Sequence, residues 1–320
     1  MTRPRTSAPA KVNLGLTVTA RRPDGFHELR SVFLRLELAD EVTLGETTAA
    51  HDTLVVEGDP ECPIEGNLTL RAVAGFRAAA SVPVPSHAVR LRKRIPMEAG
   101  LAGGSSDAAA VLRLLEGRYP GALDDARRAQ VARRLGADVP FFMAAVGAGL
   151  VSGTGERVEP LPPPIAPLGV LLVRPAVGLA TARVFDAWDA LHPDADPMDA
   201  GPSVVDELAA ELRAGASPAT LLGLVARLRD ANDLWPAAVA VEPRMAAIRG
   251  SLEDRLGRPV LMTGSGSALV ALHDDPAAAA SAARALRADP PSTLAGAWVT
   301  ASATGTPYPP VVDIEEEQGA

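Results

Sequence analysis

The chain has 320 residues, a formal net charge of −8, 47% hydrophobic residues and 22% charged residues. This is the composition of a packed globular protein long enough for two domains. The acidic balance argues against nucleic acid as a partner, because duplex binding relies on basic surface that displaces counterions.

Cys62 is the only cysteine, which excludes an intrachain disulfide and a cysteine-rich metal site. The first residues, 1–7, are not followed by the apolar core of a secretory signal, and the longest apolar run, 139–151, is too short to cross a bilayer. We therefore expect a cytoplasmic protein without a membrane partner. Whether it is a monomer or a homodimer stays open.

The N-terminal region is predicted to be rich in strands, after a short basic leader. Residues 8–18 alternate as in a strand, which places Lys11 and Asn13 on one face. Pro and Asp-Gly favour a turn at 21–25. Further strands are predicted at 26–29, 32–38 and 40–44.

A glycine-rich stretch, 96–110, is the most informative segment. It stands between a predicted strand at 89–95 and a helix with apolar residues on one face. Its small residues let backbone N–H groups surround an anion, so we predict a phosphate site. It is neither a Walker A motif nor a dinucleotide fingerprint. The alternative is a flexible loop in which Ser105 or Ser106 caps the helix.

Other elements are predicted from periodicity and capping residues. Asn67 is expected to cap a helix at 68–76, and Thr181 one that starts at 181. Further helices are predicted at 124–135, 205–212, 218–228, 243–256 and 277–288, strands at 169–173 and 297–300, a hairpin turn at 152–156, a strand–turn–strand unit at 259–272, and a loop at about 192–203.

The proline-rich segment 160–167 is predicted to be a stiff domain connector. The expected domains are 1–160 and 161–305. The acidic tail, 306–320, is predicted to be disordered.

Three segments together resemble the GHMP small-molecule kinases: 9–14, the 96–110 stretch and 263–267. Further motifs, at 24–29, 135–141 and 232–234, are similar to one branch of that superfamily. The match runs in order to about residue 303. It implies a two-domain α/β (α+β) fold, with an N-terminal domain related to ribosomal protein domains, a ferredoxin-like C-terminal domain, and the active site between them.

The resemblance also implies an activity: ATP-dependent phosphorylation of the 2-hydroxyl of 4-diphosphocytidyl-2-C-methyl-D-erythritol, in the non-mevalonate route to isoprenoid precursors. Mg²⁺ accompanies the ATP, and its ligands stay undecided.

One alternative is a kinase for another small alcohol, such as mevalonate or homoserine, against which Phe26, His27 and Phe185 argue. Another is a catalytically silent nucleotide-binding relative, against which Lys11, Asn13 and Asp138 argue.

The expected catalytic pair is Asp138, which accepts the proton of the alcohol, and Lys11, which keeps Asp138 ionised and offsets charge on the substrate oxygen. The structural alternatives are a helix cap for Asp138 and a solvated lysine at position 11. Asn13 is expected to hydrogen-bond the substrate, which Asp138 also contacts.

The resemblance places Phe26 and His27 in a cytidine pocket, with Phe185 as the second face of a stack and Thr181 nearby. Phe26 stands where the family commonly has Tyr, so it lacks the hydroxyl. Without the resemblance, Phe26 and Phe185 would be interpreted as residues of the hydrophobic core, and Thr181 as a helix cap. Substrate or phosphate contact is also implied for the turn glycines, Gly264 and Gly266, which otherwise indicate a tight turn.

For ATP, the resemblance implies Asn67 and Lys93 near the adenine, although a helix cap and a strand lysine explain them equally well. The ATP loop consists of Pro96, Met97, Glu98, Ala99, Gly100, Leu101, Ala102, Gly103, Gly104, Ser105 and Ser106. It departs from the common form at Glu98, Ala99 and Ala102, and at Asp107, where Asn is frequent. We expect Asp107 to point away from the phosphates or towards magnesium.

Overall fold

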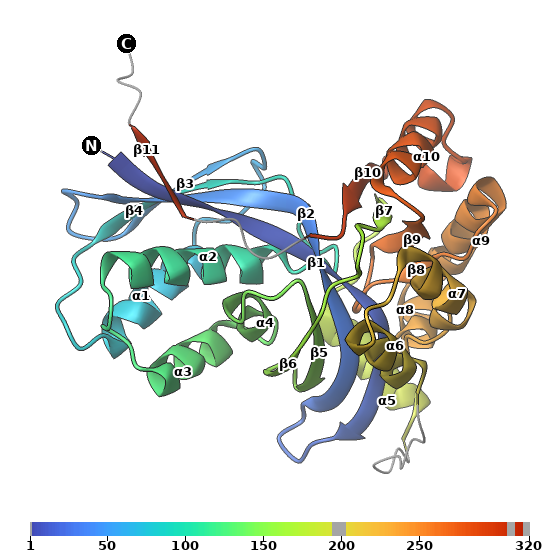
Figure 1. Cartoon of the computed structure of the whole chain (residues 1–320), viewed down its shortest axis with the longest axis horizontal. Helices are drawn as coiled ribbons and strands as arrows, with labels where there is room; N and C mark the ends of the chain where they lie inside the picture. The colour runs from blue at the N-terminus through green and yellow to red at the C-terminus, as the bar shows by residue number, and fades with distance from the viewer. Residues whose placement is uncertain (1, 194–202, 306–310, 316–320) are drawn as a thin grey trace.

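The computed structural model describes residues 2–193, 203–305 and 311–315, and contains two β-sheets with helices packed against them (Figure 1). The first sheet has seven strands, in the order β11-β1-β2-β4-β3, with β5 and β6 continuing from β2. The second has four, in the order β10-β7-β9-β8. Among the described helices, none combines the length and apolar character needed to cross a bilayer.

A long antiparallel hairpin, β1 (Thr2–Arg21) and β2 (His27–Glu46), runs across the molecule (Figure 1). The strands predicted at 26–29, 32–38 and 40–44 are one strand, because β2 pairs along its whole length with β1. Its far edge is covered by two different strands, β5 (Ala148–Gly153) and β4 (His87–Arg92). β6 (Arg157–Leu161) pairs with β5, and β3 (Thr53–Glu57) lies parallel to β4.

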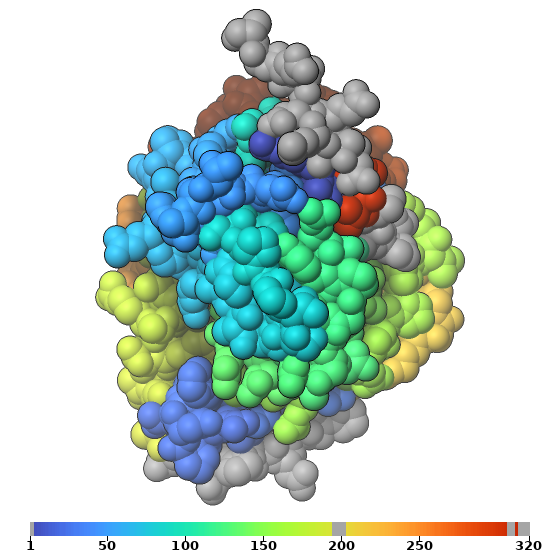
Figure 2. All heavy atoms as spheres, turned by 90° about the vertical axis from the view of Figure 1, so that its left-hand side faces the viewer, coloured from blue at the N-terminus to red at the C-terminus, as the bar shows by residue number. Residues whose placement is uncertain are grey.

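Three helices pack against the first sheet: α1 (Leu68–Ala79), α2 (Gly103–Arg118) and α4 (Val139–Met143). A further helix, α3 (Asp125–Leu135), packs against these three helices. α2 contacts β1, β2, α1 and α4, which explains why its small residues Ala108, Ala109 and Ala110 are all buried. Figure 2 shows α1 and α3 covering this face, with the turn between β1 and β2 projecting at its lower end.

The second sheet consists of β7 (Gly169–Arg174), β8 (Leu261–Met262), β9 (Leu269–His273) and β10 (Trp298–Ala303). The helices around it are α5 (Thr181–Leu191), α6 (Val204–Arg213), α7 (Pro218–Leu228), α8 (Trp235–Val241), α9 (Arg244–Leu256) and α10 (Pro276–Ala288), with a 3₁₀ turn, η1 (Ser292–Leu294). The helices predicted here are confirmed. α8 was not predicted, because it is short and contains Pro236 in its first turn.

The proline-rich segment connects the two sheets, since β6 ends at Leu161 and β7 begins at Gly169. One buried cluster nevertheless combines Val12 and Leu34 of the hairpin with Val170 and Leu208 of the second half. The β1–β2 hairpin therefore contributes to a hydrophobic core that it shares with the C-terminal half of the chain. A domain boundary at 160/161 remains a prediction.

The prediction of a disordered tail is wrong for its middle part. Val312–Glu315 forms β11, which pairs antiparallel with β1 at 2–5, so the basic leader is also part of a strand. The alternation of Val312, Asp313 and Ile314 suits a strand, and the edge of β1 supplies unpaired backbone groups. The remainder of the tail, 306–310 and 316–320, lies outside the described residues, as does most of the predicted 192–203 loop.

Candidate active site

One cavity of about 890 Å³ lies beside the β1–β2 hairpin, the glycine-rich loop and α5, in the size range of small-molecule sites. It is lined by nearly all the predicted site residues, namely Lys11, Asn13, Phe26, His27, Asn67, Lys93, Pro96, Met97, Glu98, Ala99, Gly100, Leu101, Ala102, Gly103, Gly104, Ser105, Asp138, Thr181, Phe185 and Gly264. Ser106 and Gly266 lie outside this lining. Ser106 is fully buried, and Gly266 packs closely against Leu179 and Met262.

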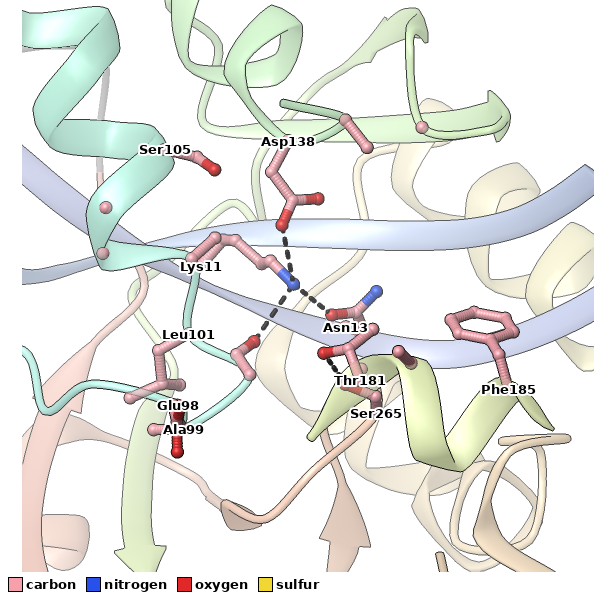
Figure 3. A pocket seen from close by; sticks show the side chains of 18 of the residues that line it. Lys11, Asn13, Glu98, Ala99, Leu101, Ser105, Asp138, Thr181, Phe185 and Ser265 are labelled. Carbon is pink, nitrogen blue, oxygen red and sulfur yellow. Dashed lines mark hydrogen bonds and ion pairs between the residues drawn. The ribbon is translucent and has the colours of Figure 1, made fainter. Parts of the chain in front are cut away.

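Lys11 lies at the centre of the cavity (Figure 3). Its Nζ donates hydrogen bonds to Oδ1 of Asn13 at 2.6 Å and to the carbonyl of Gly100 at 3.1 Å. Oδ2 of Asp138 is 3.7 Å away, and the ring of Phe33 lies beneath the ammonium. Burial lowers the pKa of Lys11, and the charge of Asp138 opposes that shift. Strand β1, the glycine-rich loop and the start of α4 therefore meet at one ammonium.

Asp138 precedes α4, and its carboxylate points towards Lys11 (Figure 3). Within the described part of the chain, its side chain makes no capping hydrogen bond to the helix. The capping interpretation is therefore wrong for the side chain. The carboxylate stays 29% exposed to the cavity, where it is accessible to a ligand.

Asn13 is held in a network of hydrogen bonds. Its Nδ2 donates to the hydroxyl of Ser31 at 3.0 Å, and its backbone N–H donates to the hydroxyl of Thr263 at 2.8 Å. Since Oδ1 also accepts from Lys11, Asn13 positions the ammonium. Its predicted contact with substrate stays a prediction. Ser31, on β2, was not predicted as a site residue, and Thr263 was noted only as part of the 263–267 motif, because contacts with Asn13 from distant segments leave no local pattern.

The glycine-rich loop leads directly into the N-terminus of α2, which begins at Gly103. Ala102 adopts φ 57° in the left-handed region, and no side chain of the described residues caps this helix end. The alternative of a Ser105 or Ser106 cap is therefore wrong. The uncapped N–H groups of the first turn can bind an anion, as the phosphate prediction requires. A Cβ on Gly100 would lie 2.6 Å from the carbonyl of Thr263, so only glycine fits there.

At the other end of the cavity, His27 lies against two aromatic side chains of α5. Its ring stacks on Phe185, with centroids 4.8 Å apart, and meets Trp188 edge-on. Phe26 is 62% exposed, in the turn before β2. Thr181 is the first residue of α5 and does not cap it, which corrects that prediction. Its hydroxyl shares a hydrogen bond with that of Ser265.

Comparison with known proteins identifies the family. The GHMP kinases N terminal domain matches residues 67–145, and the GHMP kinases C terminal domain matches 208–292. The chain is 38% identical to 4-diphosphocytidyl-2-C-methyl-D-erythritol kinase of Rhodopseudomonas palustris, over 93% of this chain and 96% of the relative. It is also 38% identical to the enzyme of that name from Thermus thermophilus, over 88% of this chain and 92% of the relative.

The chain belongs to the family of 4-diphosphocytidyl-2-C-methyl-D-erythritol kinases. A crystal structure of 4-(cytidine 5'-diphospho)-2C-methyl-D-erythritol kinase superimposes with a TM-score of 0.70 at 36% identity, covering 94% of this chain and 99% of that one. A homoserine kinase from Cytophaga hutchinsonii, at 15% identity and a TM-score of 0.66 over 98% and 97%, shares the fold alone. The two-domain GHMP fold and an ATP-dependent small-molecule kinase are thereby confirmed.

In this kinase, the side chains of Asn67 and Lys93, which are expected near the adenine, both interact with other groups of the protein. Asn67 caps α1, since its side chain accepts from the backbone N–H of Thr69. The ammonium of Lys93 is buried and forms ion pairs with Asp40 and, at 2.8 Å, with Asp107. The sequence contains only two lysines, Lys11 and Lys93, and both line this cavity.

Asp107 lines the same cavity, and its Oδ2 accepts a hydrogen bond from the ammonium of Lys93 at 2.8 Å. Its expected orientation relative to the phosphates or magnesium stays a prediction. Burial, and then the negative charge of Asp40, raise its pKa well above the ordinary value. The described residues also leave its Oδ1 without a hydrogen-bond partner. No group of three or more His, Cys, Asp or Glu side chains in the described residues is arranged to hold a metal ion.

The raised pKa of Asp107 predicts a pH-dependent effect of Asp107→Asn on stability. The folded state binds this proton more tightly than the unfolded state, so the wild-type protein loses stability as pH rises above about 4. An amide has no such proton to lose. We therefore expect the stability of the variant, relative to wild type, to increase between pH 5 and pH 8 in urea unfolding. A relative stability that falls over this range would show that the ionised carboxylate is the stabilising form.

The 263–267 turn of the kinase is fixed by a buried side chain, Asn232. Its Nδ2 donates to the carbonyls of Met262 at 3.0 Å and Gly264 at 2.9 Å, and its Oδ1 accepts from the N–H of Leu234 at 3.1 Å. Asn232 was noted in the sequence only as part of a family motif. It holds the turn against Asn13 and the loop at Gly100.

We expect Asn232→Ala to lower the free energy of unfolding by about 2–4 kcal/mol, because it leaves three buried backbone groups without partners. Urea denaturation measures this loss. Asn67→Ala is the matched control, since it removes a helix cap worth about 1 kcal/mol. A loss for Asn232→Ala no larger than that of the control would contradict the assignment.

Proposed function

We propose that this kinase transfers the γ-phosphoryl group of ATP to the 2-hydroxyl of 4-diphosphocytidyl-2-C-methyl-D-erythritol. The observation that carries the proposal is that one cavity joins three parts. These are the uncapped N-terminus of α2, the Lys11–Asp138 pair, and the His27–Phe185 stack. The names of the relatives, which match over most of their length, support the same substrate.

In the proposed mechanism, Asp138 accepts the proton of the attacking hydroxyl, while the ammonium of Lys11 offsets charge on the substrate oxygen. The N–H groups at the start of α2 bind the phosphates of ATP. Phosphoryl transfer depends mainly on positioning and charge neutralisation, which this arrangement supplies. Lys11 also donates hydrogen bonds to Asn13 and to the carbonyl of Gly100, and these bonds fix the position of the Lys11–Asp138 pair relative to the ATP loop.

We also propose that Mg²⁺ accompanies ATP and supplies neutralising charge on its phosphates. The hydroxyl of Ser105, in the first turn of α2, points to the same side of the cavity as Asp138 (Figure 3), and it is the oxygen ligand that we propose for the ion. Phe26, His27 and Phe185 are proposed to hold the cytosine, and Asn67 and Lys93 to lie near the adenine. A cytoplasmic location fits the single cysteine and the polar substrates.

The direct test measures ADP release with ATP and each of three acceptors: the cytidine substrate, mevalonate and homoserine. We expect turnover with the cytidine substrate alone, at a rate within the range of about 1–100 s⁻¹ that is common for kinases. Turnover with mevalonate or homoserine instead would assign the site to another alcohol. Absence of turnover with all three would favour a silent nucleotide-binding relative.

A further inference from the structure

We propose that Asp189 is a positioning residue: it selects the tautomer of His27 that accepts a hydrogen bond from the amino group of cytosine, and thereby makes the site discriminate against uracil. Asp189 lies on α5, and it was not among the residues predicted from the sequence. The proposal rests on the proposed function, because it assumes that the base of the substrate binds at His27.

The carboxylate of Asp189 joins two different groups. Its Oδ1 lies 2.7 Å from Nε2 of His27, and its Oδ2 lies 3.3 Å from Nη2 of Arg21. A carboxylate can only accept hydrogen bonds, so Nε2 of His27 carries the proton. Arg21, at the end of β1, forms an ion pair with the second oxygen, so the carboxylate lies between two cationic or hydrogen-bonding partners.

The ring of His27 is also held in place by α5. Phe185 stacks on it with an interplanar angle of 24°, and Trp188 meets it edge-on, with centroids 5.4 Å apart. His27 is 8% exposed and lines the cavity together with Phe185. Within the described part of the chain, no group hydrogen-bonds to Nδ1. The free position of the ring is therefore Nδ1.

With the proton on Nε2, Nδ1 presents a lone pair and acts as an acceptor. Cytosine has an amino group, a donor, at position 4 of its ring, whereas uracil has a carbonyl oxygen, an acceptor, at the same position. Nδ1 of His27 thus complements cytosine, and uracil would bring two acceptors together. Sites built to hydrogen-bond a donor reject an analogue that lacks it by large factors, because the mismatched polar groups are left unpaired.

Asp189→Asn tests this inference, because Arg21 determines how an amide would orient. The amide oxygen accepts from Arg21, which turns the amide NH₂ towards Nε2 of His27. Nε2 then becomes the acceptor, the proton moves to Nδ1, and Nδ1 becomes a donor that suits uracil. A role limited to packing would weaken CDP and UDP binding alike and leave the base preference unchanged, so this readout separates positioning from structural support.

The experiment measures binding of CDP and of UDP to the full chain by calorimetry, with a non-hydrolysable ATP analogue saturating the ATP loop. The same variants are assayed for kcat and KM with the cytidine substrate. Wild type should prefer CDP to UDP by about 100-fold or more. Asp189→Asn should weaken CDP binding, strengthen UDP binding and reduce the preference to less than about 10-fold, with the kinetic effect in KM more than in kcat.

Asp254→Asn is the matched control: it makes the same chemical change at an exposed position of α9 and should keep the wild-type preference. Thermal unfolding verifies that both variants fold. Equal binding of CDP and UDP to wild type, or an Asp189→Asn variant that weakens both alike, would overturn the inference. A strong CDP preference that is lost in Asp189→Asn, without turnover of the cytidine substrate by wild type, would instead contradict the proposed function and leave the positioning role of Asp189 supported.

Discussion

Replacing Asp138 with Asn is expected to lower kcat by about 10²–10⁴-fold, the usual contribution of a positioned general base, while the protein stays folded. The amide has nearly the same shape as the carboxylate but cannot accept the proton of the attacking hydroxyl. Stability should change little, because the described residues give Asp138 no capping role and only a 3.7 Å ion pair with Lys11.

The measurement is steady-state ADP release at saturating substrates, together with thermal unfolding. Asp124→Asn is a suitable control, because the side chain of Asp124 does cap its helix, α3, by accepting from the N–H of Arg127. That variant should keep its kcat. If Asp138→Asn instead kept its kcat and lost stability, the carboxylate would be structural and the proposed mechanism wrong.

Lys11→Met is expected to produce the second large effect, a fall in kcat of about 10²–10³-fold, similar to the loss of one preorganised donor in other active sites. Met fills a similar volume but leaves the negative charge that develops on the substrate oxygen without its counterion. It also leaves the carbonyl of Gly100 without its donor, so the ATP loop should loosen and the KM for ATP should rise.

Initial rates at varied ATP separate the two effects of Lys11→Met. Lys11→Arg is the informative companion variant: it retains a positive charge but replaces a compact ammonium with a planar guanidinium that does not match the three acceptors around Lys11. We expect an intermediate rate from it. A kcat for Lys11→Met within about threefold of wild type would rule out the proposed role of the ammonium.

Local patterns in the sequence predicted the parts of the site that depend on neighbouring residues. Alternation in β1 placed Lys11 and Asn13 on one face, and both side chains do meet at the cavity. The small residues before α2 indicated an anion site, and the structure leaves that helix end uncapped among the described residues. The motif resemblance supplied Asp138, whose residue type and spacing alone were equally consistent with a helix cap.

The remaining features depend on contacts between distant segments, which local patterns do not encode. Lys93 is paired with Asp40, 53 positions away, and His27 with Asp189, 162 positions away. For the same reason the sequence divided β2 into three strands, since only its pairing with β1 shows that it is continuous. The tail strand was missed because a pattern of four residues is too short to indicate a strand by itself, and its pairing with β1 is a contact between the two ends of the chain.

The most direct test of the central claim is the position of the new phosphate on the product. We expect ³¹P nuclear magnetic resonance of a completed reaction with ATP and 4-diphosphocytidyl-2-C-methyl-D-erythritol to show one new phosphomonoester on the oxygen at carbon 2, with the cytidine diphosphate group unchanged. A phosphate on another hydroxyl, or release of inorganic phosphate with the alcohol left unmodified, would contradict it.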